Sequence, residues 1–180
     1  MKKVQASMIV LLLFFYMTVS YLVMHPNVSP GYKSYYITRD SDLTLKERKT
    51  LQPIISGYEA SYADSRVGYD GWHDREPGYR WSAGRSSRIV FLLQTDNQKI
   101  GMRGFSLRVA PLGDQRISVF LNGEAVYSGI LTEKGQVDIT FPASILVDGE
   151  NIIRIDCPNA HSTETDKRVR GIALSSFIFR

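Results

Sequence analysis

The sequence predicts an all-β protein: an antiparallel β-sandwich of the jelly-roll type, preceded by one N-terminal transmembrane helix. Two observations predict this. A long apolar stretch without charge opens the chain, and after Pro53 short apolar segments alternate with turn signals, without any strong helical period. We therefore expect a transmembrane signal anchor over residues 1–24, a tether over 25–55 and the β-sandwich domain over 56–180.

The N-terminal segment has the length of a membrane span. Residues 4–24 carry no charge, and 21 helical residues at about 1.5 Å each reach roughly 31 Å, the thickness of a bilayer's hydrocarbon core. Lys2 and Lys3 precede the segment, so the positive-inside tendency leaves the N-terminus in the cytoplasm. A cleaved signal peptide is the alternative: Thr18 and Ser20 are small residues, although no Ala-x-Ala pattern follows. Both interpretations export the domain.

The next segment predicts a tether with one short helix. Residues 25–40 contain two prolines and show no amphipathic period. Ser41 or Asp42 then caps a short helix through Leu51, which Pro53 ends.

The remainder predicts strands with one face on the core. Ile117, Val119 and Leu121 alternate with more polar neighbours, as in a half-buried strand. The dipeptide Asn122-Gly123 suits the positive φ angles of a tight hairpin turn. The predicted strands cover residues 88–94, 104–109, 116–121, 125–131, 136–141, 151–156 and 172–179.

Composition excludes some classes of function. The formal net charge is +4, and Lys2 and Lys3 supply half of it. A nucleic-acid-binding domain carries a stronger and clustered basic excess, so we expect no nucleic acid as partner. Cys157 is the single cysteine and cannot form an intramolecular disulfide. We expect it to be a small buried hydrophobe at a strand end.

Residues 71–82 (GWHDREPGYRWS) combine flat rings with charged groups. Aromatic faces supply apolar contact area, and Arg and Glu form directional hydrogen bonds, so the stretch is typical of a surface that binds polar ligands. The alternative is structural, with Trp81 as a core anchor and Glu76 paired with Arg80.

Two separated stretches resemble a known domain. The run GWHDREPGYRWS resembles a Gly-aromatic-Ser-x-x-Glu-x-x-x-Arg-Trp-Ser signature, and DKRVRGIAL resembles a closing Asp-x-Arg-x-Leu-Gly-Ile-Ala-Leu strand. Both belong to a β-sandwich accessory domain, galactose-binding-like and of jelly-roll form, at the C-terminus of bacterial membrane phosphoglycerol transferases and envelope glycosyltransferases. The matching residues are Gly71, Trp72, Glu76, Arg80, Trp81, Ser82, Asp166, Arg168, Gly171, Ile172, Ala173 and Leu174.

The chain also departs from that family. His73 replaces the usual Ser, Gly78 stands where a second Trp is common, and Arg170 replaces a Leu. The 180 residues leave no room for the transferase's catalytic domain, so the resemblance implies only an accessory module, and a fold alone does not name a ligand.

We therefore expect a membrane-anchored, non-catalytic, carbohydrate-binding-like module. The resemblance implies a bacterial inner-membrane protein with a single pass and its C-terminal domain in the periplasm. Its ligand would be an envelope glycan or glycolipid, and Trp72 or Tyr79 would stack on a sugar. The candidate ligand-binding residues are Trp72, His73, Glu76, Tyr79, Arg80, Trp81, Asp166 and Arg168.

The alternative is a structural subunit that docks onto a membrane glycosyltransferase or phosphoglycerol transferase. In that case Arg80 and Arg168 each pair with a carboxylate such as Glu76 or Asp166 and hold the ends of the sandwich together.

Catalytic and metal motifs are absent from the sequence. No nucleophile elbow, phosphate-binding Gly-rich loop or His-x-x-x-His helix occurs. We expect no enzyme activity, cofactor or transition-metal site. His73 and His161 would need a third ligand to bind zinc. A structural calcium ion stays open, because Asp148 and Glu150 lie near a turn.

Overall fold

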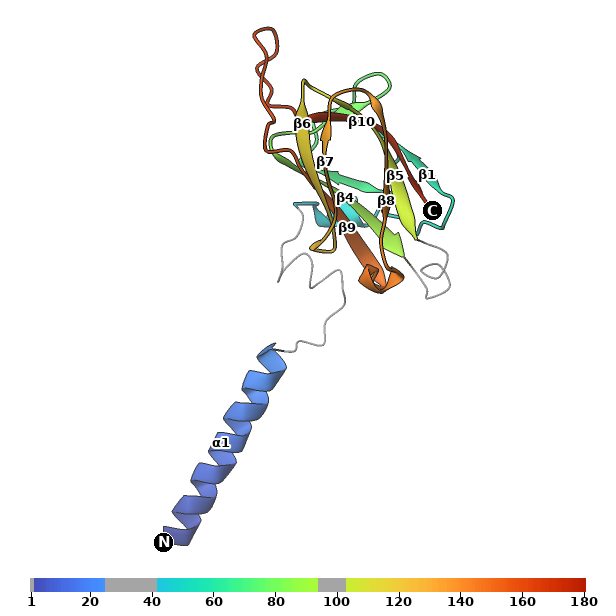
Figure 1. Cartoon of the computed structure of the whole chain (residues 1–180). Helices are drawn as coiled ribbons and strands as arrows, with labels where there is room; N and C mark the ends of the chain where they lie inside the picture. Colours follow the sequence, from blue (N-terminus) through green and yellow to red (C-terminus); the bar gives the residue numbers. More distant parts are fainter. Residues whose placement is uncertain (1, 25–41, 94–102) are drawn as a thin grey trace.

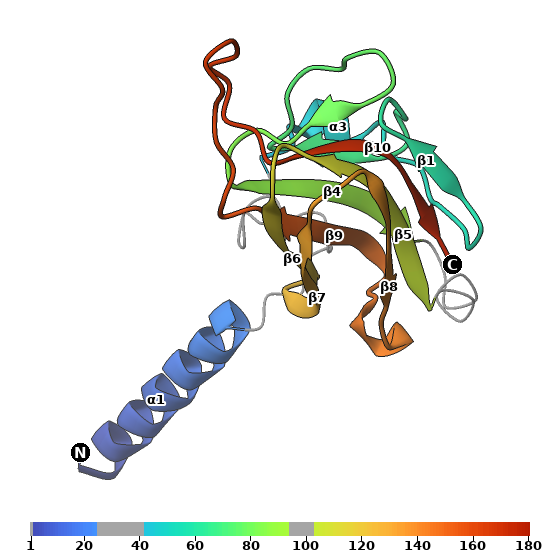
Figure 2. The ribbon, with the colours of Figure 1, turned by 45° about the horizontal axis from the view of Figure 1, so that its top comes forward.

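The protein folds into two β-sheets packed face to face, as Figure 1 shows in a computed structural model that describes residues 2–24, 42–93 and 103–180. Seen from another direction, β10 and β4 lie in separate layers (Figure 2). Each pairing between its strands is antiparallel. The predicted antiparallel β-sandwich is confirmed.

Each sheet has five strands. The first sheet has the order β1-β10-β5-β8, with β3 also paired to β10. Its strands are β1 (Glu59–Ser61), β3 (Arg80–Trp81), β5 (Gly104–Pro111), β8 (Gly135–Thr140) and β10 (Ile172–Phe179). The second sheet has the order β2-β4-β9-β6-β7. Its strands are β2 (Gly68–Asp70), β4 (Ser86–Leu93), β6 (Gln115–Leu121), β7 (Glu124–Leu131) and β9 (Gly149–Asp156).

The strand pairs are nested along the chain. β1 pairs with β10, β4 with β9, β5 with β8 and β6 with β7. This pattern arises when one long antiparallel ribbon is rolled up, so that alternate strand pairs fall in opposite sheets. It is the connectivity of a jelly roll.

Aromatic residues join the two sheets in the core. Phe179 of β10 has its ring centroid 4.6 Å from that of Phe91 of β4, in the opposite sheet, and it also contacts Phe105 and Phe177. All four are almost completely buried. On β6, residues 117, 119 and 121 face this core and alternate with more exposed residues, as the sequence predicts.

The Asn-Gly hairpin is confirmed. Asn122 has a φ of 51° and Gly123 a φ of 91°, the left-handed region that a two-residue turn of this type needs at both positions. The turn connects β6 to β7.

A buried asparagine fixes the entry to β9. The Asn151 side chain is fully buried. Its amide donates to the carbonyls of Val147 and Gly149, and its Oδ1 accepts from the N–H of Val147 and from Asn122 Nδ2. Asn122 Oδ1 in turn accepts from the N–H of Ile152. Two asparagines thus connect the hairpin to the start of β9.

The described part of the predicted tether packs on the sandwich. Leu43, Leu51 and Ile54 are buried, and the N–H of Asp42 donates to the Asp70 carboxylate at 3.0 Å. Residues 25–41 of the predicted tether, including Ser41, lie outside the described residues, as does Gln94 at the end of the first predicted strand.

The short helix of this segment is capped by a different residue from the predicted one. Helix α3 covers Leu45–Arg48. Thr44 Oγ1 accepts from the N–H of Glu47, and the Glu47 carboxylate accepts from the N–H of Thr44, which is a capping box. The expectation that Asp42 caps the helix is wrong, because the Asp42 backbone is bonded to Asp70 instead.

Helix α1 covers Lys2–Met24, and large apolar side chains such as Leu11, Phe14 and Val23 are exposed on it. In the part of the chain that the structure describes, no helix has both the length and the apolar character that a membrane crossing requires, so the transmembrane span predicted for residues 4–24 is not supported.

The seven predicted strands all exist with small shifts at their ends. Strands β1, β2 and β3, which have three, three and two residues, were not predicted from the sequence. Strands this short show no alternation, so only pairing with a neighbouring strand defines them.

Candidate functional site

The two stretches that carry the resemblance lie against each other in the fold. β3 pairs with β10 at Ala173 and Leu174. The N–H of Gly84, just after β3, donates to the carbonyl of Val169 at 2.9 Å. The loop before β10, which projects from the sandwich in Figure 2, is therefore bound to the segment 71–84.

Ser82 joins these stretches from the inside. Its side chain is buried, and its Oγ accepts from the N–H of Gly171 at 2.9 Å and of Ile172 at 3.1 Å. A Cβ at Gly171 would lie 2.7 Å from the Cβ of Cys157, so a larger residue would force the strands apart. Ser82 and Gly171 therefore have a structural role in this chain.

Arg168 joins the stretches at the surface. Its Nη2 lies 2.9 Å from Glu76 Oε1 and 2.6 Å from Asp166 Oδ2. Arg170 adds a third contact, 3.1 Å from the same Asp166 oxygen. Hydrogen bonds from Arg168 hold the pKa of Asp166 well below its usual value. Hydrogen bonds from Tyr79 and then from Arg168 lower the pKa of Glu76, so both carboxylates are charged at neutral pH.

The predicted ion pair between Glu76 and Arg80 is wrong. Glu76 faces Tyr79 in an isolated antiparallel bridge and pairs with Arg168. Successive side chains of a strand point to opposite faces, so Arg80 points away from Glu76, whereas Tyr79 and Trp81 share its side.

Tyr79 and Trp81 form a small aromatic cluster beside these ions. Their centroids lie 5.8 Å apart in an edge-to-face arrangement, and the Arg170 guanidinium lies 4.8 Å from the Trp81 ring. Both rings are half-buried. The Tyr79 hydroxyl is hydrogen-bonded to Glu76, which raises the Tyr79 pKa. We call Glu76, Tyr79, Trp81, Asp166, Arg168 and Arg170 the Tyr79–Trp81 patch.

Trp72 lies apart from this patch and packs inward. Its ring is half-buried against the core, edge-on to Tyr69 at 6.4 Å, and its indole N–H donates to the carbonyl of Arg88 at 2.9 Å. Of the two rings expected to stack on a ligand, Tyr79 is the one that lies among the charged side chains.

Arg80 points into a pocket on the other side of β3. Its guanidinium lies 4.2 Å from the centroid of the Tyr69 ring. Tyr69 lies on β2 and Arg80 on β3, at neighbouring edges of the two sheets. Tyr69 is paired with Ile89 and Arg80 with Leu174, and both of these partners face the core. The pocket therefore opens at an edge of the sandwich.

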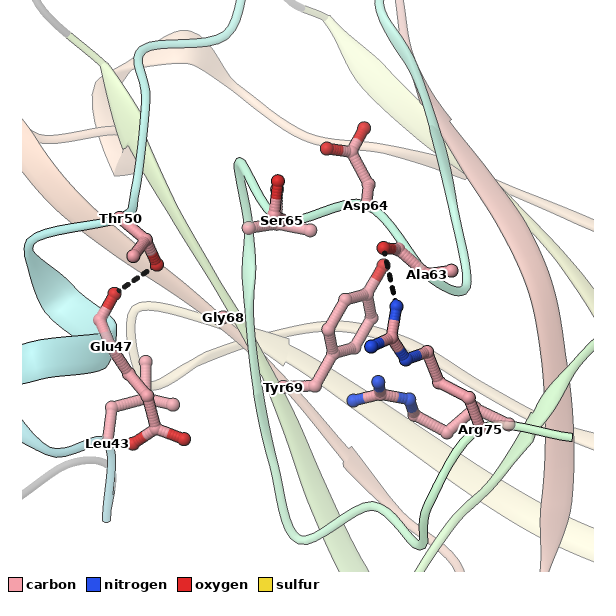
Figure 3. Close-up of a pocket in the computed structure, with 11 residues that line it drawn as sticks. Leu43, Glu47, Thr50, Ala63, Asp64, Ser65, Gly68, Tyr69 and Arg75 are labelled. Carbon is pink, nitrogen blue, oxygen red and sulfur yellow. Dashed lines mark hydrogen bonds between the residues drawn. The ribbon is translucent and has the colours of Figure 1, made fainter.

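The pocket has a volume of about 280 Å³. Figure 3 shows Leu43, Glu47 and Thr50 on one side, with Tyr69, Arg75 and the loop 63–65 on the other. Sequence reasoning missed all of its lining residues except Arg80. The Thr44-x-x-Glu47 capping signature could have located α3 correctly. No sequence pattern marks Tyr69 or Arg75 as a pocket residue.

The two histidines that the structure describes, His73 and His161, bond to backbone carbonyls. His73 Nε2 lies 3.3 Å from the carbonyl of Val169, and His161 Nδ1 lies 3.0 Å from that of Asn159. Across the ranges that the structure describes, no group of three or more His, Cys, Asp or Glu side chains could hold a metal ion. Glu150, considered as a calcium ligand, forms a buried ion pair with Arg48, so its carboxylate is already neutralised.

Cys157 is buried directly after β9, as predicted. Burial raises the pKa of its thiol to about 12, which makes it unreactive at neutral pH.

No protein-family model and no curated protein matches the sequence. Solved structures with a similar fold exist. A family two carbohydrate esterase from Clostridium thermocellum in complex with cellohexaose is 11% identical, with a TM-score of 0.43, over 63% of this chain and 31% of that one. The β-(1,4)-mannanase GH26-CBM35 from Podospora anserina is 20% identical, with a TM-score of 0.41, over 70% and 28%.

A third structure, the carbohydrate-binding module CBM36 in complex with calcium and xylotriose, is 13% identical, with a TM-score of 0.43, over 68% of this chain and 99% of that one. The chain thus spans less than a third of the length of the esterase and the mannanase. These three structures show a similar fold alone, and none of the three shows the predicted association with phosphoglycerol transferases.

Proposed function

We propose that this chain is a non-catalytic carbohydrate-binding module and that the Tyr79–Trp81 patch is its ligand site. The observation that carries the proposal is the hydrogen bond of Tyr79 to Glu76, which is itself paired with Arg168 and, through Arg168, connected to Asp166. A ring supplies apolar contact for a sugar face, and charged groups hydrogen-bond directionally to hydroxyls.

The patch is also ordered before any ligand arrives. Arg168 contacts both Glu76 and Asp166, and Ser82 connects the two backbones beneath them. Side chains that are already fixed lose little conformational entropy on binding. The same contacts also fit a structural role, so binding must be measured.

The first prediction concerns Tyr79. We expect the full-length chain to bind neutral oligosaccharides, measured by titration calorimetry with a panel of glucan and xylan fragments. Tyr79→Ala should weaken binding about tenfold, because it removes the stacking ring. Tyr79→Phe keeps the ring and should stay within about threefold of the parent chain.

Ile130→Ala is the control, since Ile130 is exposed on β7, which belongs to the other sheet from β3 and contributes no residue to the patch. If the parent chain binds none of these oligosaccharides, or if Tyr79→Ala binds them unchanged, the proposal is wrong.

We also propose that the chain is exported and held at the bacterial cytoplasmic membrane, where its ligand is an envelope glycan or glycolipid. Helix α1 supports this, because the large apolar side chains of residues 11–17 are all exposed, and such a surface needs an apolar partner. Lys2 and Lys3 at its start favour a cytoplasmic N-terminus. A membrane glycosyltransferase or phosphoglycerol transferase would be the enzyme that the module assists.

A further inference from the structure

Two guanidinium groups line the pocket at the edge of the sandwich without a carboxylate partner. Arg75 Nη1 lies 3.5 Å from the carbonyl oxygen of Ala63 (Figure 3). Arg80 lies over the Tyr69 ring, and its buried Nε has no hydrogen-bond partner. Considering only the residues that the structure describes, neither arginine forms an ion pair.

The two carboxylates that line the same pocket are bound elsewhere. Glu47 accepts from the N–H of Thr44 at 2.8 Å and from its hydroxyl at 2.7 Å. Asp64 accepts from the Tyr58 hydroxyl and from the N–H of Arg66 at 2.9 Å. These bonds hold both acids in place, and among the described residues neither acid is within ion-pair distance of Arg75 or Arg80.

The charge on Arg80 is also poorly compensated. Burial lowers the pKa of Arg80, and the like charge of Arg75 lowers it further, against the opposing effects of Tyr69 and Asp74. The Asp74 charge raises the pKa of Arg80, but the two side chains are not within ion-pair distance of each other. An anion between the two guanidinium groups would remove their repulsion.

We propose that this pocket binds a phosphate group carried by a small ligand, with Arg75 and Arg80 as the two positively charged contacts. One guanidinium fork saturates a carboxylate, whereas the oxygens of a phosphate can accept from two guanidinium groups at once. The Ser65 hydroxyl also lines the pocket and can donate to a further oxygen.

The size of the pocket agrees with a small ligand. Its volume of about 280 Å³ is at the lower limit of the roughly 300–1,000 Å³ of sites for drug-sized ligands. This space suits a phosphate with one sugar-sized group. The site goes beyond the proposed glycan site, because Arg80 and Tyr79 point to opposite sides of the chain.

The second prediction tests this pocket. Titration calorimetry of the full-length chain with inorganic phosphate, a hexose phosphate and the corresponding neutral hexose should show binding of both phosphates. We expect Arg75→Gln and Arg80→Gln each to raise the Kd for phosphate at least tenfold, since a hydrogen bond to a charged group contributes about 1.5–3 kcal/mol. A lower Kd for hexose phosphate than for inorganic phosphate would show that the pocket prefers a phosphate carried by a sugar.

Arg116→Gln is the matched control, because it removes the same charge from an exposed position on β6 and should leave the Kd unchanged. Arg75 is exposed, so Arg75→Gln remains informative even if Arg80→Gln fails to fold. Tyr79→Ala should leave phosphate binding intact, which separates this proposal from the glycan site.

Three results would overturn the proposal: no binding of either phosphate, an equal loss in Arg116→Gln, or acetate binding as tightly as inorganic phosphate. The last would show that the pocket is a general carboxylate or anion site.

Discussion

At the scale of single residues, the structure gives different roles to side chains that look alike in the sequence. Trp72 and Trp81 both lie in the stretch 71–82, yet Trp72 packs against the core while Trp81 lies beside Tyr79 at the surface. Arg80 and Arg168 were both expected to pair with acids. Arg168 pairs with two of them, and Arg80 stacks on Tyr69 instead.

Asn151 stabilises one place in the fold, the turn that leads into β9. Its amide group takes part in four hydrogen bonds that hold the hairpin and the turn before β9 in place. Replacing it would leave buried N–H and C=O groups without partners, and each such group costs about 1–3 kcal/mol.

The third prediction follows from this. We expect Asn151→Ala to lower the free energy of unfolding by about 2–4 kcal/mol, measured by urea denaturation. Asn159→Ala is the control: its side chain is exposed, and the change should stay within about 0.5 kcal/mol. A similar small change in Asn151→Ala would mean that water replaces the lost bonds.

At the scale of elements, the two-residue strand β3 separates the two candidate sites. Pairing with Ala173 and Leu174 of β10 fixes its orientation. Because neighbouring side chains alternate, Trp81 faces the ion pairs of the loop before β10 and Arg80 faces the pocket beside β2. A shift of one residue in this register would exchange the two sides.

The fourth prediction concerns the attachment of the loop 161–171 to β3. The pKa of Asp166 is lowered in the folded state, so its contribution to stability is present above the unfolded pKa of about 3.9 and is lost progressively as the pH falls from there through the lower folded-state pKa. We expect amide protection at Gly84 and Arg170, whose N–H groups bond within this region, to fall below about pH 4.

Hydrogen exchange measured as protection factors checks this expectation. Asp166→Asn should show low protection at these amides at neutral pH already, with little further change on acidification. Glu164→Gln, an exposed change in the same loop, should behave as the parent chain does. Equal profiles for all three chains would show that Asp166 does not hold the loop.

At the scale of the whole molecule, the chain combines an apolar helix with a sandwich whose candidate sites both lie beside β3. The fifth prediction tests the proposed location. In fractionated cells, the full-length chain should remain in the membrane fraction after an alkaline wash. The double variant Leu12→Lys/Leu13→Lys places two charges among the exposed apolar side chains of α1 and should shift the protein to the soluble fraction.

Ile130→Lys provides the control, because it changes an exposed apolar residue of the sandwich and should not alter the distribution. Recovery of the parent chain in the soluble fraction would contradict the membrane proposal.

The sandwich, its seven longer strands, the Asn122-Gly123 hairpin and the burial of Cys157 could all be predicted from the sequence. These features depend on local alternation and on turn chemistry, which are written in neighbouring residues. The sequence also placed Glu76, Tyr79, Trp81, Asp166 and Arg168 among the candidate residues, although it could not say which acid each arginine contacts.

Three features could not be predicted from the sequence: Arg168 and not Arg80 pairs with Glu76, Trp72 packs inward, and Arg75, Arg80 and Tyr69 line one pocket. These outcomes depend on the pairing of β3 with β10 and on the edge where β2 meets α3. Contacts between residues so distant in the chain are fixed by strand register and burial, which no local pattern encodes.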